Sequence, residues 1–172
     1  MPKFLHPFEK PAYFEQALFL YIKYSKFLDD DYAQNGLPIF DYFVNLINNS
    51  LFFVIVEGDL VSGFVYLDNF RGNDEKLHSA ELTTCFDKRF WGDYTKICAL
   101  IFLEHCFEKY KFEKIKALVY PENFRVKTLL KSAGFEKEAL LRGETLRNNK
   151  LQDIEVYSCK RKAKDDIFCS LS

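Results

Sequence analysis

The residue types best suited to chemistry gather in the stretch CFDKRFWGDYTK, residues 85–96. A short apolar segment ends there at a basic and an aromatic pair, residues 88–91. Gly92 follows, and then a long apolar run that predicts a helix. A strand that leads into a helix N-terminus directs several free backbone N–H groups into one space, where the helix dipole adds positive potential. The stretch therefore predicts a phosphate or pyrophosphate site, with an ordinary strand-to-helix turn as the alternative.

Candidates for acid–base chemistry lie on the preceding strand, HSAELTTCF, residues 78–86. A partly buried carboxylate has a raised pKa, which suits a general base, so Glu81 is the first candidate and a structural Glu is the alternative. His78 is the second, because an imidazole titrates near neutral pH. It lies three residues earlier and so on the opposite face of a regular strand, and a solvent-exposed histidine is the alternative.

Hydrophobic periodicity predicts the elements that position these residues. The predicted helices span residues 13–28, 38–48, 93–110 and 122–132, and the predicted strands span 51–56, 61–67, 78–86 and 114–120, followed by a hairpin around Asn148 and Asn149. The polar segment DNFRGNDEK, residues 68–76, is expected to be a loop. The order is α-α-β-β-β-α-β-α-β-β, with room for a short strand before the first helix, so the fold class is α/β with a mixed sheet.

Composition narrows the class of protein. The length suits one domain, residues 1–161, with a tail at 162–172. A formal net charge of −1 argues against a nucleic-acid protein held by bulk electrostatics. The five cysteines are widely spaced without a CxxC pair, so neither a disulfide framework nor a zinc site is expected. Without a signal peptide or an apolar run long enough for a bilayer, we expect a cytoplasmic protein that does not bind membranes.

Several motifs further along the chain resemble one family in register. From about residue 51 to 159 the chain is similar to GNAT-type N-acetyltransferases, and most similar to the branch that contains ribosomal-protein N-terminal acetyltransferases. The matching residues are Ala80-Glu81-Leu82, Phe90-Trp91-Gly92, Asn123, Gly134-Phe135, Glu138, Arg142, Asp153, Tyr157 and Ser158. The resemblance implies a GNAT-like, mostly antiparallel twisted sheet flanked by helices.

The resemblance also implies a reaction. Acetyl-CoA would be the donor, and a primary amine, either a protein N-terminus or a small amine, would attack it directly in a ternary complex. The loop before the helix would cradle the CoA pyrophosphate, and the preceding strand would pair with the pantetheine arm. The implied cofactor contacts are Thr83, Thr84, Cys85, Phe86, Arg89, Phe90, Trp91, Gly92, Asp93, Tyr94, Thr95, Lys96, Asn123 and Arg125. Glu81 and His78 are the catalytic candidates. No metal is expected to take part, and the protein is expected to form a homodimer.

The chain departs from the family pattern at three positions. Tyr94 stands where a small residue usually lets the phosphate come close. Leu130 replaces a tyrosine that often acts as general acid, and Val126 replaces a serine. These departures motivate the alternative of a non-catalytic acyl-CoA-binding or protein-interaction module with the same fold.

Two other sequence features carry weaker expectations. The acidic run at residues 29–31 is expected either to attract a cationic amine or to be an ordinary solvated loop. Cys85 would need an activated thiolate and a nearby base to act as a nucleophile, so a packed strand cysteine is the favoured interpretation.

Overall fold

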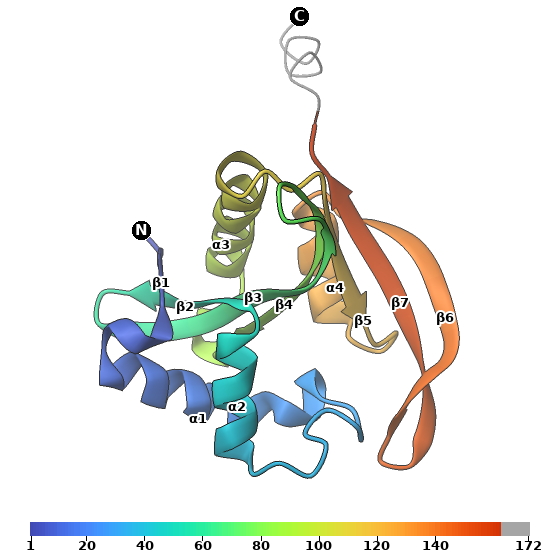
Figure 1. The fold of residues 1–172 in the computed structure, drawn as a ribbon, viewed down its shortest axis with the longest axis horizontal. Coiled ribbons are helices and arrows are strands. Elements are labelled where there is room, and N and C mark those ends of the chain that lie inside the picture. The colour runs from blue at the N-terminus through green and yellow to red at the C-terminus, as the bar shows by residue number, and fades with distance from the viewer. Residues whose placement is uncertain (163–172) are drawn as a thin grey trace, which may run out of the picture.

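The computed structural model of the 172-residue chain describes residues 1–162 (Figure 1). The helices are α1 (Pro11–Leu28), α2 (Ile39–Asn48), α3 (Asp93–Glu104) and α4 (Phe124–Ser132), and α3 continues into a π-helical segment, His105–Lys109. The strands are β1 (Lys3–Leu5), β2 (Leu51–Glu57), β3 (Leu60–Gly72), β4 (Leu77–Phe86), β5 (Lys114–Val119), β6 (Glu136–Arg147) and β7 (Lys150–Lys160), and 3-10 turns lie at Pro7–Glu9 and Lys88–Phe90. The predicted tail, apart from residue 162, lies outside the described residues.

The seven strands form one sheet in the order β1-β2-β3-β4-β5-β7-β6. All neighbours are antiparallel except β4 and β5, which run parallel. The crossover between those two strands is α3, as a parallel connection requires. The predicted order of elements and the mixed sheet are confirmed, and the short strand ahead of the first helix is present.

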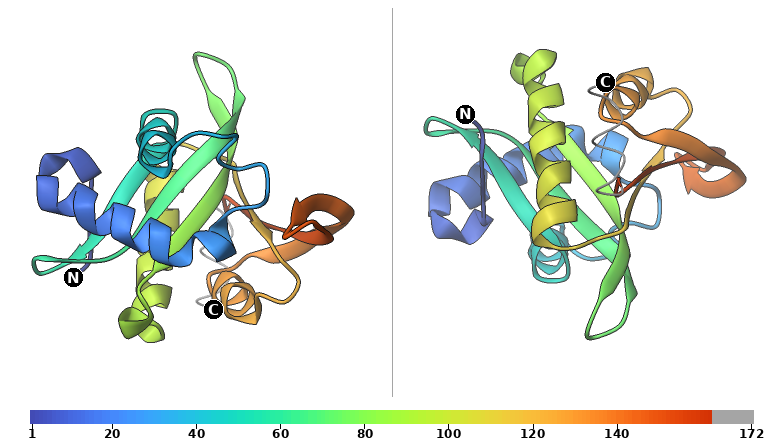
Figure 2. Two further views of the ribbon diagram at one scale, coloured as in Figure 1. Left: turned by 90° about the horizontal axis from the view of Figure 1, so that it is seen from below. Right: turned by 90° about the horizontal axis from the view of Figure 1, so that it is seen from above.

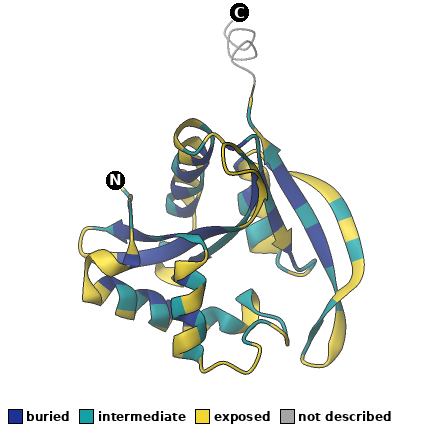
Figure 3. Cartoon of the chain, viewed as in Figure 1, coloured by how far each residue is buried: buried dark blue, intermediate teal, exposed yellow. Residues whose placement is uncertain are grey.

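Helices cover both faces of the sheet. Figure 2 shows α1 and α2 on the face seen from below and α3 on the face seen from above. The central strands are apolar on both sides for this reason: along β3, Val65 and Leu67 pack in the core under α3 and α4, whereas Phe64 and Tyr66 pack in the core under α1 and α2. Figure 3 shows the buried residues concentrated on these central strands. Among the described residues, no helix combines the length and apolar character that a membrane crossing needs.

A cluster of aromatic residues fills the core under α1 and α2. Phe43 contacts Phe52 edge-on, with ring centroids 5.6 Å apart, and Phe52 stacks on Tyr66 at the same centroid separation. Tyr21 and Phe64 complete this cluster, and all five side chains are buried. Such pairs add to the stabilisation from buried area. Core packing therefore accounts for this cluster of aromatic residues, without a role in binding another protein.

The segment that was predicted to be a polar loop continues the sheet instead. β3 runs on to Gly72, and pairing with β4 shifts by one residue between Asp68 and Arg71. This β-bulge puts Asn69 at a φ of +47°, the one non-glycine residue with positive φ inside a strand of the described chain. The prediction for residues 68–72 is thus wrong, because cross-strand pairing with the start of β4 overrides their polar composition.

The connection between α1 and α2 is tied to the turn between β6 and β7. The Asp31 carboxylate accepts hydrogen bonds from the backbone N–H groups of Asn148 (2.9 Å) and Asn149 (2.8 Å), and its own N–H donates to the carbonyl of Leu146 at 2.9 Å. Asp30 accepts from the Thr145 hydroxyl at 2.5 Å. The acidic run therefore holds the N-terminal helices to the far hairpin.

We expect Asp31→Ala to loosen this tether. Loss of two hydrogen bonds to a charged group should make the amides of Asn148 and Asn149 exchange with solvent roughly tenfold faster, which corresponds to about 1.4 kcal/mol. Hydrogen exchange followed by NMR measures both amides directly. Asp59→Ala, in the exposed β2–β3 turn, is the control; unchanged exchange in Asp31→Ala would contradict the tether.

Candidate functional site

The main groove of the molecule opens where β4 and β5 separate. The two strands pair only at Ser79–Lys114, Ala80–Ile115 and Glu81–Lys116. Beyond these pairs the facing edges of β4 and β5 have no strand partner, and Figure 1 shows the strands running apart. A groove of about 1400 Å³ fills the gap, lined by both strands, the start of α3, α4 and the α1–α2 connection. Strand edges that face such a groove offer free backbone donors and acceptors to a ligand.

One end of the groove reaches the N-terminus of α3. Gly92 precedes the helix with φ +117° and ψ −140°, a conformation that favours glycine, and a Cβ built on it would meet nothing within 4 Å. The backbone N–H groups of residues 92–95 donate to no other group of the described chain. The Thr95 hydroxyl donates to the Gly92 carbonyl at 2.7 Å and so orders the first turn. The helix start therefore offers free N–H groups beside open space, which the predicted anion site requires, and anion binding here stays a prediction.

Asp87 holds the turn that leads into this site. Its buried carboxylate accepts hydrogen bonds from the backbone N–H and the Nε of Arg89, both at 3.0 Å, and from Lys23 of α1 at 3.1 Å. Burial opposes ionisation of Asp87, but the bonds from Arg89 and Lys23 outweigh it and lower its pKa to about 2. The turn is thus pinned to α1 by a charged network.

Three residues of the predicted anion-binding loop do not line the groove: Arg89, Phe90 and Tyr94. Arg89 is engaged with Asp87. Tyr94 turns away, with its hydroxyl 3.0 Å from the Ser62 hydroxyl and its ring 5.5 Å from that of Phe90. The bulky side chain at this position therefore leaves the groove free, while its backbone N–H stays at the helix start.

The mouth of the groove is flanked by Trp91 and Arg125. The Arg125 guanidinium lies 4.0 Å from the centre of the Trp91 ring, and the indole N–H donates to the Phe86 carbonyl at 3.1 Å. This cation–π contact joins the α3 side of the groove to α4. Asn123, which also lines the groove, accepts from the Val126 N–H at 3.3 Å and so caps α4. Two positive side chains of the predicted set, Lys96 and Arg125, line the groove, and the stack on Trp91 holds Arg125 there.

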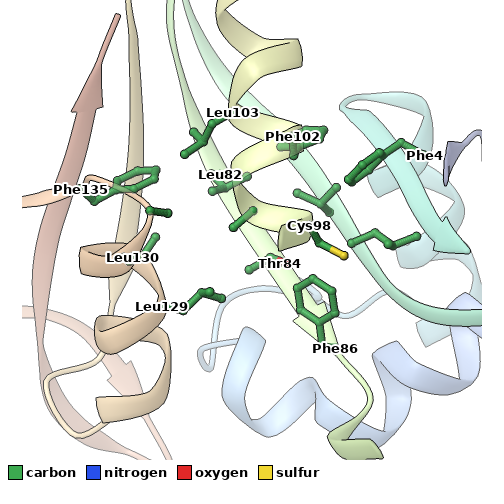
Figure 4. A pocket seen from close by; sticks show the side chains of 14 residues that line it. Phe4, Leu82, Thr84, Phe86, Cys98, Phe102, Leu103, Leu129, Leu130 and Phe135 are labelled. Carbon is green, nitrogen blue, oxygen red and sulfur yellow. The ribbon is translucent and has the colours of Figure 1, made fainter. Parts of the chain in front are cut away.

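Successive residues of β4 serve the two faces of the sheet. Leu82, Thr84 and Phe86 face α3 and α4, where they line a small apolar cavity of about 30 Å³ together with Leu129 and Leu130 (Figure 4). Leu130, at the position where a tyrosine acid is expected in the family, is buried in this cavity. The helix therefore presents no proton donor there.

The other face of β4 looks toward α1 and α2. It carries Glu81, Thr83 and Cys85, all of which line the groove. The Cys85 thiol is buried, and burial raises its pKa to about 12. A thiol that stays protonated is a poor nucleophile, so the structure favours the packed interpretation of Cys85.

Glu81 lies at the groove, and His78 does not. Glu81 accepts from the Asn69 amide at 2.8 Å and pairs with Lys116 at 3.4 Å. His78 is exposed near the start of β4 and does not line the groove. Of the two catalytic candidates, the structure thus brings Glu81 alone to the site.

A second carboxylate, Asp68, stands beside Glu81 and was missed at the sequence level. The two are cross-strand partners on β3 and β4, and both line the groove. Burial, followed by the charge of Glu81, raises the pKa of Asp68 to about 6. The alternation of Phe64, Tyr66 and Asp68 with a period of two was the signal that could have found it.

Acidic residues of the α1–α2 connection also reach this end of the groove. Asp29 and Asp30 line it. Asp29 accepts from the Tyr21 hydroxyl at 2.6 Å, and burial raises the pKa of its carboxyl. Asp30 and Asp31 accept hydrogen bonds from the β6–β7 hairpin, so all three carboxylates of the acidic run have a hydrogen-bond donor within the protein. Asp29 and Asp30 also bring carboxyl groups to the groove.

Comparison with known families and structures gives one consistent result. The family described as "Acetyltransferase (GNAT) domain" matches residues 25–136, more than half of the chain. A search of curated proteins found no match.

Several solved structures share the fold. The ribosomal-protein-S5-alanine acetyltransferase from Vibrio fischeri has a TM-score of 0.71 at 14% identity, with 92% of this chain and 91% of that chain covered. A putative phosphinothricin N-acetyltransferase has a TM-score of 0.70 at 12% identity, with 95% and 99% covered. A chimera of spermidine N-acetyltransferase from Vibrio cholerae has a TM-score of 0.70 at 19% identity, with 92% and 94% covered. At these identities the likeness shows the fold alone.

The Asp87 network predicts a specific sensitivity to acid. Because the folded-state pKa of about 2 lies below the usual 3.8, the carboxylate contributes stability above pH 4 that is lost as the pH falls toward 2. The contribution is about 2 kcal/mol. Asp87→Asn should therefore unfold more easily in urea at pH 7 and match the wild-type protein at pH 2. Asp59→Asn, in an exposed turn, is the control; a difference for Asp87→Asn that stays constant with pH would refute the assignment.

Proposed function

The chain belongs to the GNAT acetyltransferases, and from this we propose that it is an N-acetyltransferase that moves the acetyl group of acetyl-CoA to a primary amine. The attack is direct, within a ternary complex. The observation that carries the proposal is the groove between β4 and β5, which joins free N–H groups at the start of α3 to the carboxylates Glu81 and Asp68. A donor and an acceptor would meet between these two ends.

The donor side of the proposal rests on backbone groups. The N–H groups of residues 92–95 suit the CoA pyrophosphate, and the dipole of α3 adds to the attraction. The free edge of β4 from residue 82 onward suits the pantetheine arm, which would add to the sheet as a further strand. Arg125 supplies positive charge at the mouth. Acetyl-CoA itself would supply the activated thioester.

The acceptor side of the proposal lies toward α1 and α2. Carboxylates on this side attract an ammonium group and can take its proton. A free backbone N–H on the β4 edge would stabilise negative charge on the thioester oxygen during attack. Leu130 offers no proton, and the groove-lining hydroxyls of Thr128 and Ser132 donate to backbone carbonyls of their own helix. We therefore propose that the departing thiolate is protonated by the attacking amine rather than by α4.

Structural neighbours suggest which amines to test first. These neighbours are named as acetyltransferases of spermidine, of the alanine of ribosomal protein S5 and of phosphinothricin. The negatively charged acceptor end favours a cationic amine over phosphinothricin, which is itself acidic. We therefore propose spermidine-like amines or a peptide N-terminus as the acceptor class.

Activity with these amines tests the proposal. Purified protein is incubated with acetyl-CoA and each of spermidine, a peptide with N-terminal alanine, and phosphinothricin, and release of the CoA thiol is followed. Turnover with at least one cationic amine is expected. Tight binding of acetyl-CoA in a calorimeter without any turnover would support the alternative of a non-catalytic acyl-CoA-binding module, and absence of binding would support an interaction domain.

Two other expectations belong to the proposal. A homodimer is proposed because β6 is an edge strand whose outer side has no partner in the sheet. A cytoplasmic location is proposed from the cysteines, because the four that lie in the described part of the chain are all free thiols.

A glycine substitution tests the donor site. Gly92→Asp would place a negative charge and a strained backbone at the proposed pyrophosphate site, so the affinity for acetyl-CoA should fall by about tenfold or more. Calorimetric titration with acetyl-CoA measures it. Gly58→Asp is a matched control, because Gly58 also has a positive φ, +62°, and lies in the β2–β3 turn. Equal affinity in the two variants would remove the loop from the donor site.

A further inference from the structure

We propose that Asp68, rather than Glu81, accepts the proton of the acceptor amine. Glu81 is then a positioning residue, whose neighbouring charge helps Asp68 to bind that proton. This inference rests on the proposed acetyltransferase function and assigns a residue to it. Both carboxylates face the groove on the α1 and α2 side of the sheet, where the acceptor is expected. They differ in what they touch.

Glu81 is already occupied by donors. One carboxylate oxygen accepts from the Asn69 amide at 2.8 Å, and the other lies 3.4 Å from the ammonium of Lys116. Both contacts hold the side chain in place and occupy its oxygens, so an ammonium group that approached Glu81 would have to displace a donor.

Asp68 has no such partners. Its carboxylate takes no hydrogen bond from another residue of the described chain, although it lines the groove. A half-buried carboxylate without a donor gains most from a ligand that brings one. An ammonium group in the groove is such a ligand.

The backbone at this point is built in an unusual way. The β-bulge after Asp68 puts Asn69 at φ +47° in the middle of β3, and the Asn69 side chain is the one that binds Glu81. Bulges and strained positions of this kind re-aim side chains and are enriched near active sites. Here the Asn69 side chain at the bulge holds Glu81, and Asp68 lies directly opposite Glu81 as the last pair of the regular ladder before the bulge.

The electrostatic surroundings agree with this assignment. Burial and then the charge of Glu81, on β4, raise the pKa of Asp68 to about 6, so it is ionised at neutral pH but binds a proton readily. Tyr66 of its own strand and Tyr42 of α2 also face it, and both have raised pKa values because of burial, so they remain neutral. Asp29 and Asp30 of the α1–α2 connection line the same end of the groove, where Asp29 accepts from the Tyr21 hydroxyl and Asp30 accepts from the Thr145 hydroxyl. Lys116 of β5 lies on the far side of Glu81 and is paired with it.

The reaction then balances as follows. The ammonium group of the acceptor gives one proton to Asp68, and the freed nitrogen lone pair forms the N–C bond to the thioester carbonyl. The C–S bond breaks with its electron pair on sulfur, and the second nitrogen proton passes to that sulfur, which gives an amide and the free thiol. Asp68 returns its proton to water. Net, one ammonium ion and one thioester give one amide, one thiol and one proton.

The pH dependence of turnover separates the two carboxylates. With the best amine of the panel above, wild-type kcat/KM for the amine, which reports ionisation of the unliganded protein, should fall as the pH drops below about 6. Asp68→Asn should lose at least 100-fold in kcat and the acidic limb with it. Glu81→Gln should keep the limb but move it to lower pH, because removal of the neighbouring charge lowers the pKa of Asp68. Asp74→Asn, in the exposed β3–β4 turn, should match the wild type, and acetyl-CoA affinity should be unchanged in all three variants.

The opposite pattern overturns the assignment. If Glu81→Gln removes the acidic limb and Asp68→Asn keeps it, Glu81 is the base. A second measurement needs no acceptor, because the carboxyl resonances of ¹³C-labelled aspartate can be followed as a function of pH. The resonance that is missing in Asp68→Asn is that of Asp68, and its titration midpoint should lie near pH 6. In Glu81→Gln this midpoint should move to a lower pH. A midpoint near 4 refutes the proposal. If the wild-type protein acetylates no amine, the proposed function fails, and this titration still decides whether Asp68 has the required proton affinity.

Discussion

The groove depends on the short stretch over which β4 and β5 pair. Three residue pairs are enough to join the two halves of the sheet, and their separation afterwards leaves two free strand edges inside the protein. Free backbone groups in a protein interior are costly unless water or a ligand satisfies them. The α3 crossover sets the parallel direction of the strands and also places its own unpaired N–H groups at the end of the same gap. One topological feature thus creates both the space and the polar groups of the groove.

The two faces of the sheet also differ in polarity at the groove. Side chains that alternate along β4 face different helix layers, so Leu82 and Thr84 line an apolar cavity under α3 and α4, whereas Glu81 belongs to the polar side under α1 and α2. Charge is concentrated on that second side by Asp68, Asp29 and Asp30. In the proposed reaction, an apolar donor arm and a cationic acceptor can therefore approach the same strand in different environments.

Much of this arrangement was predictable from the sequence, because hydrophobic periodicity and the anchors around Glu81, Gly92 and Gly134 depend on local spacing. The misses have a common physical origin in long-range contacts. Residues 68–72 have a loop-like composition, and only pairing with β4 makes them a strand. Tyr94 was expected to crowd the groove, but its direction depends on Ser62, 32 positions earlier. The roles of Asp31 and Asp87 likewise come from partners distant in sequence, Asn148 and Lys23.

The loop at Gly92 has a consequence for how such a protein evolves. Its four unpaired donors, residues 92–95, belong to the main chain, so replacement of any side chain except the glycine leaves them in place. Recognition built on the main chain is insensitive to sequence drift. Neighbours between 12% and 19% identical still superpose over more than 90% of this chain. The proposed acceptor end is made of side chains such as Asp68, so single substitutions can alter it while the fold stays the same.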